Sequence, residues 1–141
     1  MDLLLWIIDK IVARQQKRRC VKVLVHEAVF LGRDPVTGRP IGSEPHYFVK
    51  VTNLSETREI EITHVWINGN PQVHLMNPAR PLPARLRLDE TWEDWVRVAD
   101  VTHVSKVERA FRVRLSNTQV IKSRPNKDVP PVGYLAGAGD R

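Results

Sequence analysis

The first twenty residues carry apolar positions with the spacing of a helix. Drawn at about 100° per residue, seven apolar side chains fall on one broad face, and Asp2, Asp9 and Lys10 fall opposite. The seven are Leu3, Leu4, Leu5, Ile7, Ile8, Ile11 and Val12. Asp2 near the start and Arg18 near the end suit the helix macrodipole. The pattern therefore predicts an amphipathic helix over residues 1–19.

After this segment the apolar positions alternate, as they do in strands with one buried face. The clearest stretch is 46–67, where Val49 and Val51, and then Ile60 and Ile62, are separated by single polar residues. This stretch predicts two antiparallel strands with one wet face, joined by a polar turn.

Three further stretches alternate in the same way, at 20–31, 84–98 and 110–124, and two turns flank a short segment at 73–76. The glycine- and proline-rich residues 32–45 predict a long loop. No second helical pattern follows the first. Seven or eight short strands separated by turns predict an all-β domain, a sandwich or a barrel.

Two segments resemble immunoglobulin-like and fibronectin type III-like domains. YFVKVTNLSETREIEI, at 47–62, resembles their V-x-V-x-N strand, short polar turn and I-x-I strand, and LRLDETWEDWV, at 86–96, resembles a later acidic turn before an inward tryptophan. The whole chain also resembles small bacterial proteins of unassigned role. The resemblance implies an immunoglobulin-like β-sandwich of seven or eight strands over 20–124, followed by an extended tail over 125–141. It implies no activity.

Charge is unevenly distributed along the chain. The 141 residues fit one domain and carry a formal net charge of +6. Residues 1–22 hold six basic and two acidic groups, residues 23–105 hold eight and eleven, and residues 106–141 hold eight and three. Basic ends suit an anionic partner, or they serve solubility alone. The one cysteine, Cys20, allows no intramolecular disulfide, which suits the reducing cytoplasm.

The N-terminal helix has three open interpretations. A signal peptide is not expected, because the basic residues follow the apolar run. The run from Leu3 to Ala13 is also shorter than the about 20 apolar residues that span a bilayer. The helix packs on its own domain, docks on a protein partner or a second copy, or lies at a membrane interface. In the docking interpretation the contact residues are Leu4, Ile8, Ile11 and Val12.

The last predicted hairpin carries outward-facing cations. With a three-residue turn at 117–119, Leu115 lies opposite Ile121 and Val113 lies opposite Ser123 on the inner face. On the outer face, Arg114 then lies opposite Lys122, and Arg112 lies opposite Arg124.

Like charges directly opposite one another destabilise a sheet, so this face requires a counter-charge. An acidic neighbouring strand with Glu59 and Glu61 is one source, and a bound polyanion is the other. The absence of aromatic residues among these cations argues against nucleic acid. The residues expected to bind a polyanion are Arg14, Lys17, Arg18, Arg19, Arg112, Arg114, Lys122 and Arg124.

Patterns for catalysis or metal binding are not found in the sequence. It contains no phosphate loop, dinucleotide fingerprint or serine elbow. No two of its five histidines are closer than ten residues, whereas zinc ligands are often closely spaced. The carboxylates of residues 89–94 fit a solvated acidic loop. We expect no catalytic residues, no metal, no cofactor and no small-molecule substrate.

The sequence thus favours a non-enzymatic intracellular interaction module, cytoplasmic or peripheral at the membrane. It would contact a protein partner or a second copy through the N-terminal helix and the basic C-terminal strands. The alternative is a polyanion-binding protein that takes nucleic acid or an anionic membrane surface.

Overall fold

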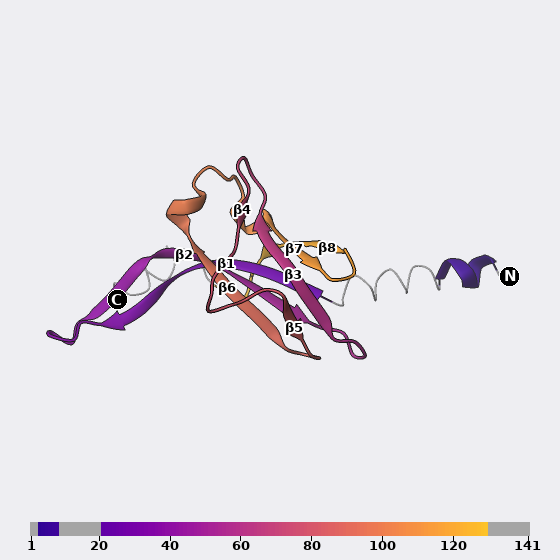
Figure 1. Cartoon of the computed structure of the whole chain (residues 1–141), viewed down its shortest axis with the longest axis horizontal. Coiled ribbons are helices and arrows are strands. Elements are labelled where there is room, and N and C mark those ends of the chain that lie inside the picture. Colours follow the sequence, from indigo (N-terminus) through magenta and orange to yellow (C-terminus); the bar gives the residue numbers. More distant parts are fainter. Residues whose placement is uncertain (1–2, 9–20, 130–141) are drawn as a thin grey trace.

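The computed structural model describes residues 3–8 and 21–129 of the chain (Figure 1). Residues 3–8 are helical, and most of the remainder is strand and turn. The strands are β1 (Val21–Arg33), β2 (Pro40–Asn53), β3 (Ile60–Ile67), β4 (Val73–His74), β5 (Ala84–Leu86), β6 (Thr91–Arg97), β7 (Phe111–Leu115), β8 (Val120–Lys122) and β9 (Arg124–Pro125). Two 3-10 helices, η1 (Val98–Val101) and η2 (Val107–Arg109), lie between β6 and β7. The predicted all-β class is confirmed.

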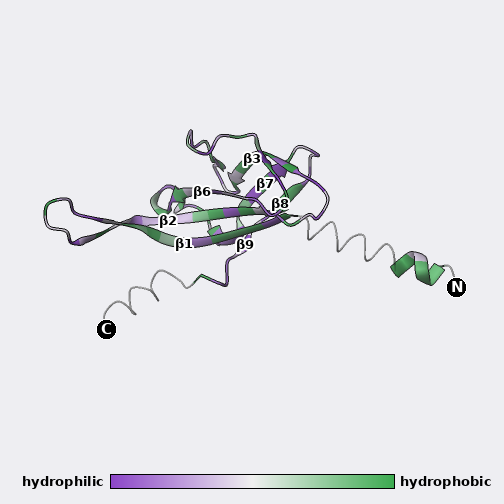
Figure 2. Ribbon diagram, turned by 90° about the horizontal axis from the view of Figure 1, so that it is seen from below, coloured by the Kyte–Doolittle hydropathy of each residue, from purple (hydrophilic) through white to green (hydrophobic). Residues whose placement is uncertain are grey.

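The strands of the described chain form two sheets. Sheet A has the order β6-β2-β1-β9, and sheet B has the order β4-β3-β7-β8 with β5 also paired to β3. In Figure 2, β1 and β2 of sheet A run beneath β3 and β7 of sheet B. The two strands predicted over 46–67 exist, but their pairing is wrong, because β2 and β3 belong to different sheets. The turn at 54–59 therefore carries the chain from one layer to the other.

One apolar cluster packs between the two sheets. Val49 and Val51 of β2 and Ile62 of β3 are 0% exposed, and Ile60 is half-buried against them. Burying each such side chain contributes about 1.5–3 kcal/mol. The expected period-two burial is confirmed on both layers. The cluster comprises Val21, Val23, Val25, Val49, Val51, Ile62, Val65, Ile67, Leu75, Leu86, Trp92, Val101, Val107, Ala110, Phe111, Val113 and Leu115.

The crossing from β2 to β3 depends on a buried asparagine. Asn53 is 0% exposed, and its Nδ2 donates hydrogen bonds to the carbonyls of Arg58, Leu86 and Arg87 at 2.9–3.2 Å. Its Oδ1 accepts a hydrogen bond from the amide of Ser55 at 3.0 Å. One side chain therefore ties the end of β2 to the crossing turn and to the end of β5, which lies in the other sheet.

The β1–β2 hairpin continues well beyond the core as an arm, residues 27–46 (Figures 1 and 2). Its pairing extends to Arg33 opposite Pro40, so the long loop predicted over 32–45 is wrong. Two local features close a short turn instead. Asp34 Oδ1 accepts a hydrogen bond from the Val36 amide at 2.8 Å, and Gly38 adopts a left-handed φ of 69°.

The base of the arm carries a second packed group, on the face of sheet A that points away from the core. We call it the aromatic cluster; its rings lie 5.1–6.4 Å apart and belong to His26, Phe30, His46, Phe48 and Trp95. Phe48 is only 8% exposed although it faces away from the core. His26 stacks on Phe48, and its buried Nδ1 has no hydrogen-bond partner among the described residues. Burial lowers the pKa of His26 because the charged ring would lose its solvation.

Candidate functional site

Strand β7 divides its side chains between the core and the outer face of sheet B. Phe111, Val113 and Leu115 are buried, whereas Arg112 is half-buried and Arg114 is exposed. This division follows from the alternation of side chains along a strand. The predicted inner and outer faces of this strand are therefore confirmed.

The predicted pairing within this hairpin is wrong by two residues. Arg112 lies opposite Lys122, Val113 opposite Ile121, and Arg114 opposite Val120. The Leu115 amide donates to the Gln119 carbonyl at 2.9 Å, which closes a turn in which Thr118 adopts a φ of 72°. A shift of two residues keeps the side chains of the paired residues, 112–114 and 120–122, on their predicted faces, because the side-chain period of a strand is two.

Arg124, predicted to lie opposite Arg112, belongs to the other sheet. It begins β9, which pairs with β1 so that Arg124 lies beside Leu24. Ser123 directs this change of sheet. Its hydroxyl accepts a hydrogen bond from the Phe111 amide at 3.1 Å and donates one to the Glu108 carbonyl at 2.8 Å.

Strand order brings aromatic and basic residues into one row across sheet B. His74 of β4 lies opposite Trp66 of β3, Trp66 lies opposite Arg112 of β7, and Arg112 lies opposite Lys122 of β8. Facing side chains in such pairs are separated by about 4.5–5.5 Å at Cβ. A second row runs from His64 through Arg114 to Val120. We define the cationic face as His64, Trp66, His74, Arg112, Arg114 and Lys122.

Three side chains of the cationic face are held in place. The Trp66 and His74 rings stack with centroids 6.1 Å apart and an interplanar angle of 25°. Arg112 Nη1 donates hydrogen bonds to the carbonyls of Arg109 and Phe111 at 2.8 and 2.9 Å. The guanidinium is thereby oriented before any ligand arrives.

The acidic residues expected to neutralise these cations pair with a different arginine. Glu59 and Glu61 lie 3.9 and 3.8 Å from Arg85 of β5. Within residues 3–8 and 21–129, the arginines and lysines that form ion pairs are Arg85, Arg87 and Arg97. Arg112, Arg114 and Lys122 have no acidic partner in that part of the chain. The cationic face therefore retains the counter-charge requirement that the sequence suggested.

The two aromatic residues of this site, Trp66 and His74, were not predicted from the sequence. Trp66 and His74 lie far from the basic hairpin in sequence, and the apparent lack of aromatics among the cations argued against nucleic acid. The pairing of β3 with β7 removes that argument, because it places Trp66 beside Arg112. The only available signal was the outward position of Trp66 between Val65 and Ile67.

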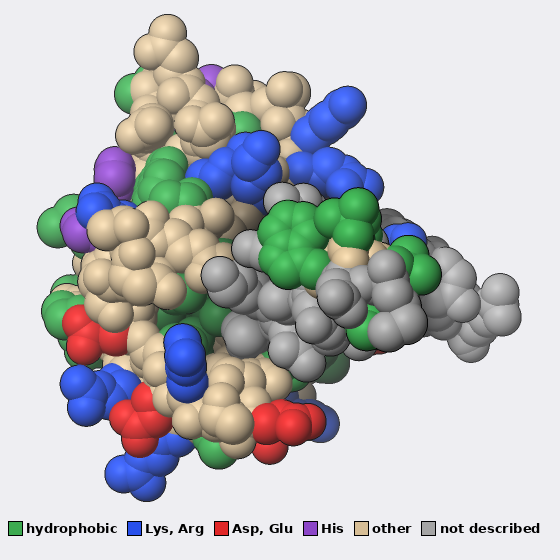
Figure 3. Space-filling model, turned by 90° about the vertical axis from the view of Figure 1, so that its right-hand side faces the viewer, with side chains coloured by type: hydrophobic (Ala, Val, Ile, Leu, Met, Phe, Trp, Pro, Cys, Tyr) green, Lys and Arg blue, Asp and Glu red, His purple; other side chains and the backbone are tan. Residues whose placement is uncertain are grey.

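The N-terminal helix exposes its apolar residues. Leu4 is 66% and Ile8 is 47% exposed, and Figure 2 shows this hydrophobic helix standing away from the sheets. Figure 3 views the molecule from that side, where Lys and Arg side chains lie on several parts of the surface. The other predicted contact residues lie outside the described residues; they are Ile11, Val12, Arg14, Lys17, Arg18 and Arg19. No helix in the described ranges is long and apolar enough to cross a membrane.

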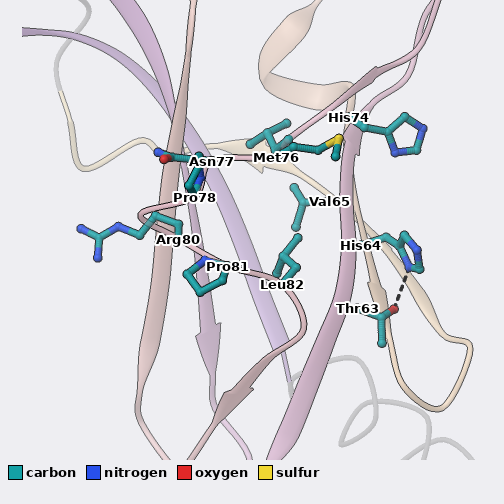
Figure 4. Close-up of a pocket in the computed structure, with 11 residues that line it drawn as sticks. Thr63, His64, Val65, His74, Met76, Asn77, Pro78, Arg80, Pro81 and Leu82 are labelled. Carbon is teal, nitrogen blue, oxygen red and sulfur yellow. Dashed lines mark hydrogen bonds between the residues drawn. The ribbon is translucent and has the colours of Figure 1, made fainter.

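An apolar pocket of about 390 Å³ borders the cationic face, where the edge of β3 lies between β4 and β5 (Figure 4). Its lining includes Val65, Met76 and Leu82. It also includes His64 of β3 and His74 of β4, which lie on the other side of β3 from Arg80 and Pro81. The pocket adds an apolar border to the face.

The remaining chemical groups do not converge on one site. Across residues 3–8 and 21–129, no three His, Cys, Asp or Glu side chains group closely enough to hold a metal ion. The expected solvated acidic loop is wrong for Asp94, which is 1% exposed. Its carboxylate accepts hydrogen bonds from the Trp95 amide and from Asn77 Nδ2 at 2.8 and 3.1 Å, and so holds the 75–83 loop against β6.

Comparisons with protein-family models, with curated proteins and with solved structures found no match for this chain. The assignment of the candidate site therefore rests on the geometry of this chain alone.

Proposed function

We propose that this protein binds single-stranded nucleic acid on the cationic face. The observation that carries the proposal is the row from His74 through Trp66 and Arg112 to Lys122, with no acidic partner for its cations in the described chain. Proteins that bind single strands combine cations that follow the phosphates with aromatic rings on which bases stack. The row offers both within the width of four strands.

The stacked pair of Trp66 and His74 favours nucleic acid over an anionic membrane. A membrane-binding surface inserts a stripe of apolar side chains beneath its cations. This face instead presents two stacked rings, half-buried Trp66 and exposed His74, beside Arg112. The orientation of Arg112 by two carbonyls also suits a defined phosphate contact better than a diffuse headgroup layer.

The test measures binding of a fluorescent twenty-nucleotide oligothymidylate by the full chain across a range of salt concentrations. The triple variant Arg112→Ala, Arg114→Ala and Lys122→Ala should weaken binding at least tenfold. It should also reduce the salt slope by about 2, because each phosphate contact on a single strand contributes about 0.7. The matched control, Arg33→Ala, Arg39→Ala and Arg58→Ala, removes equal charge elsewhere and should bind nearly as well as the unmodified chain.

Trp66→Ala tests the aromatic contribution separately. Loss of one stacking platform should cost about 1–3 kcal/mol of binding at unchanged salt slope. Equal binding by the basic triple variant and its control, or tighter binding to phosphatidylserine vesicles than to the oligonucleotide, would contradict the proposal.

A second candidate function, docking on a protein or on a second copy through the N-terminal helix, is favoured by the exposure of Leu4 and Ile8. The test first establishes whether the full chain self-associates in light scattering, captures a protein partner or floats with vesicles. Leu4→Glu with Ile8→Glu should abolish whichever of these behaviours the unmodified chain shows. The control Leu54→Glu with Met76→Glu changes two other exposed apolar residues. Identical behaviour of both variants and the unmodified chain would remove this candidate.

We also propose that the two layers form an immunoglobulin-like sandwich. In immunoglobulin domains strands A, B and E share one sheet, and strands C, F and G share the other. The adjacency of β6, β2 and β1, and of β3, β7 and β8, supports this correspondence. An experimental structure with β2 paired to β3 would contradict it.

A further inference from the structure

A second basic feature lies where β3 ends and β7 begins, at the border of the cationic face. It is a pocket of about 370 Å³, which we call the end pocket. Its polar lining comes from Asn68, His103, Ser105, Lys106, Arg109 and Arg112. None of its lining residues is Asp or Glu, so three cations face a hollow without an acidic group in its described walls.

One side-chain hydrogen bond and two backbone features shape the walls of the end pocket. His103 Nε2 donates a hydrogen bond to the Pro71 carbonyl at 3.0 Å, which anchors one side. A Cβ on Gly69 would lie 3.0 Å from Val104 Cγ2, so glycine permits the two lining segments to approach this closely. Lys106 adopts a left-handed φ of 51° at the turn before η2. These features set the course of the backbone around the pocket, and the side chains of Lys106 and Arg109 are exposed at its rim.

Arg112 belongs to both features. It lines the end pocket and also lies directly opposite Trp66 in the cationic face. Because Nη1 is held by two backbone carbonyls, the other guanidinium donors remain available for a ligand. An anion beside Arg112 would therefore lie next to a base stacked on Trp66.

We propose that the end pocket binds a phosphate group, and that this phosphate belongs to the nucleotide whose base stacks on Trp66. The second half of this inference rests on the proposed function. Arginine and lysine together suit a phosphate, because the planar fork of arginine matches two oxygens and the ammonium adds a compact charge.

The experiment compares full-chain variants that alter the pocket without touching the row. Lys106→Gln with Arg109→Gln should weaken binding of the oligothymidylate about tenfold. The control Arg33→Gln with Arg39→Gln removes equal charge at the tip of the arm and should change binding less than twofold. Thermal unfolding of both variants verifies that they are folded.

A second measurement isolates the phosphate. Titration of inorganic phosphate at constant ionic strength should shift the backbone amide NMR signals of Gly69, Ser105 and Lys106 saturably, and the pocket variant should abolish these shifts. Equal oligonucleotide binding by the pocket variant and its control would overturn this inference and leave the proposed function standing. If no oligonucleotide binds but phosphate still saturates the pocket, the proposed function fails, and the pocket is a site for free phosphate rather than for a strand.

Discussion

The two sheets present opposite kinds of outer face. On sheet A the aromatic cluster buries Phe48, and Arg97 beside it has acidic partners, Asp100 at 3.0 Å and Glu44 at 3.5 Å. Lys50 lies opposite Glu93 in the register of β2 and β6. On sheet B, Arg112 lies opposite Lys122, and both lack an acidic partner in the described chain.

This difference separates a face that stabilises the protein from one that does not. Packed rings and opposite charges lower the free energy of the folded chain without any ligand. Facing cations raise it, and a bound anion would reverse that contribution. The unsatisfied face is therefore the better candidate for function.

The largest expected effect comes from removing a buried ring from the aromatic cluster on sheet A. Phe48→Ala should lower the free energy of unfolding by about 3 kcal/mol, because a buried ring is replaced by a cavity. Trp66→Ala on the other face should lower it by about 1 kcal/mol or less. Urea denaturation of both variants measures the two changes, and equal losses would remove the distinction between the faces.

Next in size is the effect of one cation on each face. Lys122→Ala should weaken oligonucleotide binding about fivefold to tenfold and leave stability unchanged or slightly raised, because a like-charge contact is lost. Lys50→Ala, opposite Glu93, should leave binding unchanged and slightly lower stability. Fluorescence anisotropy and urea denaturation together measure both quantities; a clear stability loss in Lys122→Ala would contradict the account.

A smaller effect concerns the turn that sets the register of the cationic face. Thr118 is a β-branched residue at φ 72°, and Asn tolerates this conformation better. Thr118→Asn should raise the free energy of unfolding by about 1 kcal/mol. The control Thr102→Asn, at φ −63°, should have little effect. An unchanged unfolding midpoint for Thr118→Asn would indicate a different turn.

The smallest expected effect is a pH dependence of the aromatic cluster. The pKa of His26 is lowered in the folded chain, so the unfolded chain binds a proton more readily. Stability should therefore fall as the pH drops through about 6.5, the unperturbed histidine pKa, toward the lower folded pKa. Comparison of urea midpoints at pH 7.5 and 5.5 should show a smaller decrease in His26→Phe than in the unmodified chain, and His64→Gln serves as the control. Equal decreases in His26→Phe and the unmodified chain would remove His26 as the cause.

Alternation predicted the strands and their buried sides well, because it is a property of each strand alone. It placed Val49, Val51 and Ile62 inward and Arg112 and Arg114 outward, as found. The long loop predicted over 32–45 was wrong. Glycine and proline suggested a loop there, although the two strands continue to Arg33 and Pro40. Turn geometry also escaped prediction, because the left-handed Thr118 gives no signal in composition.

By itself, then, the sequence determined the all-β class, the inward side chains and the presence of outward cations at the C-terminal hairpin. Only the tertiary structure decided which strands are neighbours, and hence that Trp66 lies beside Arg112 while Glu61 pairs with Arg85. The physical reason is range: side-chain alternation is set within a few residues, whereas strand order is set by packing between segments far apart in the chain.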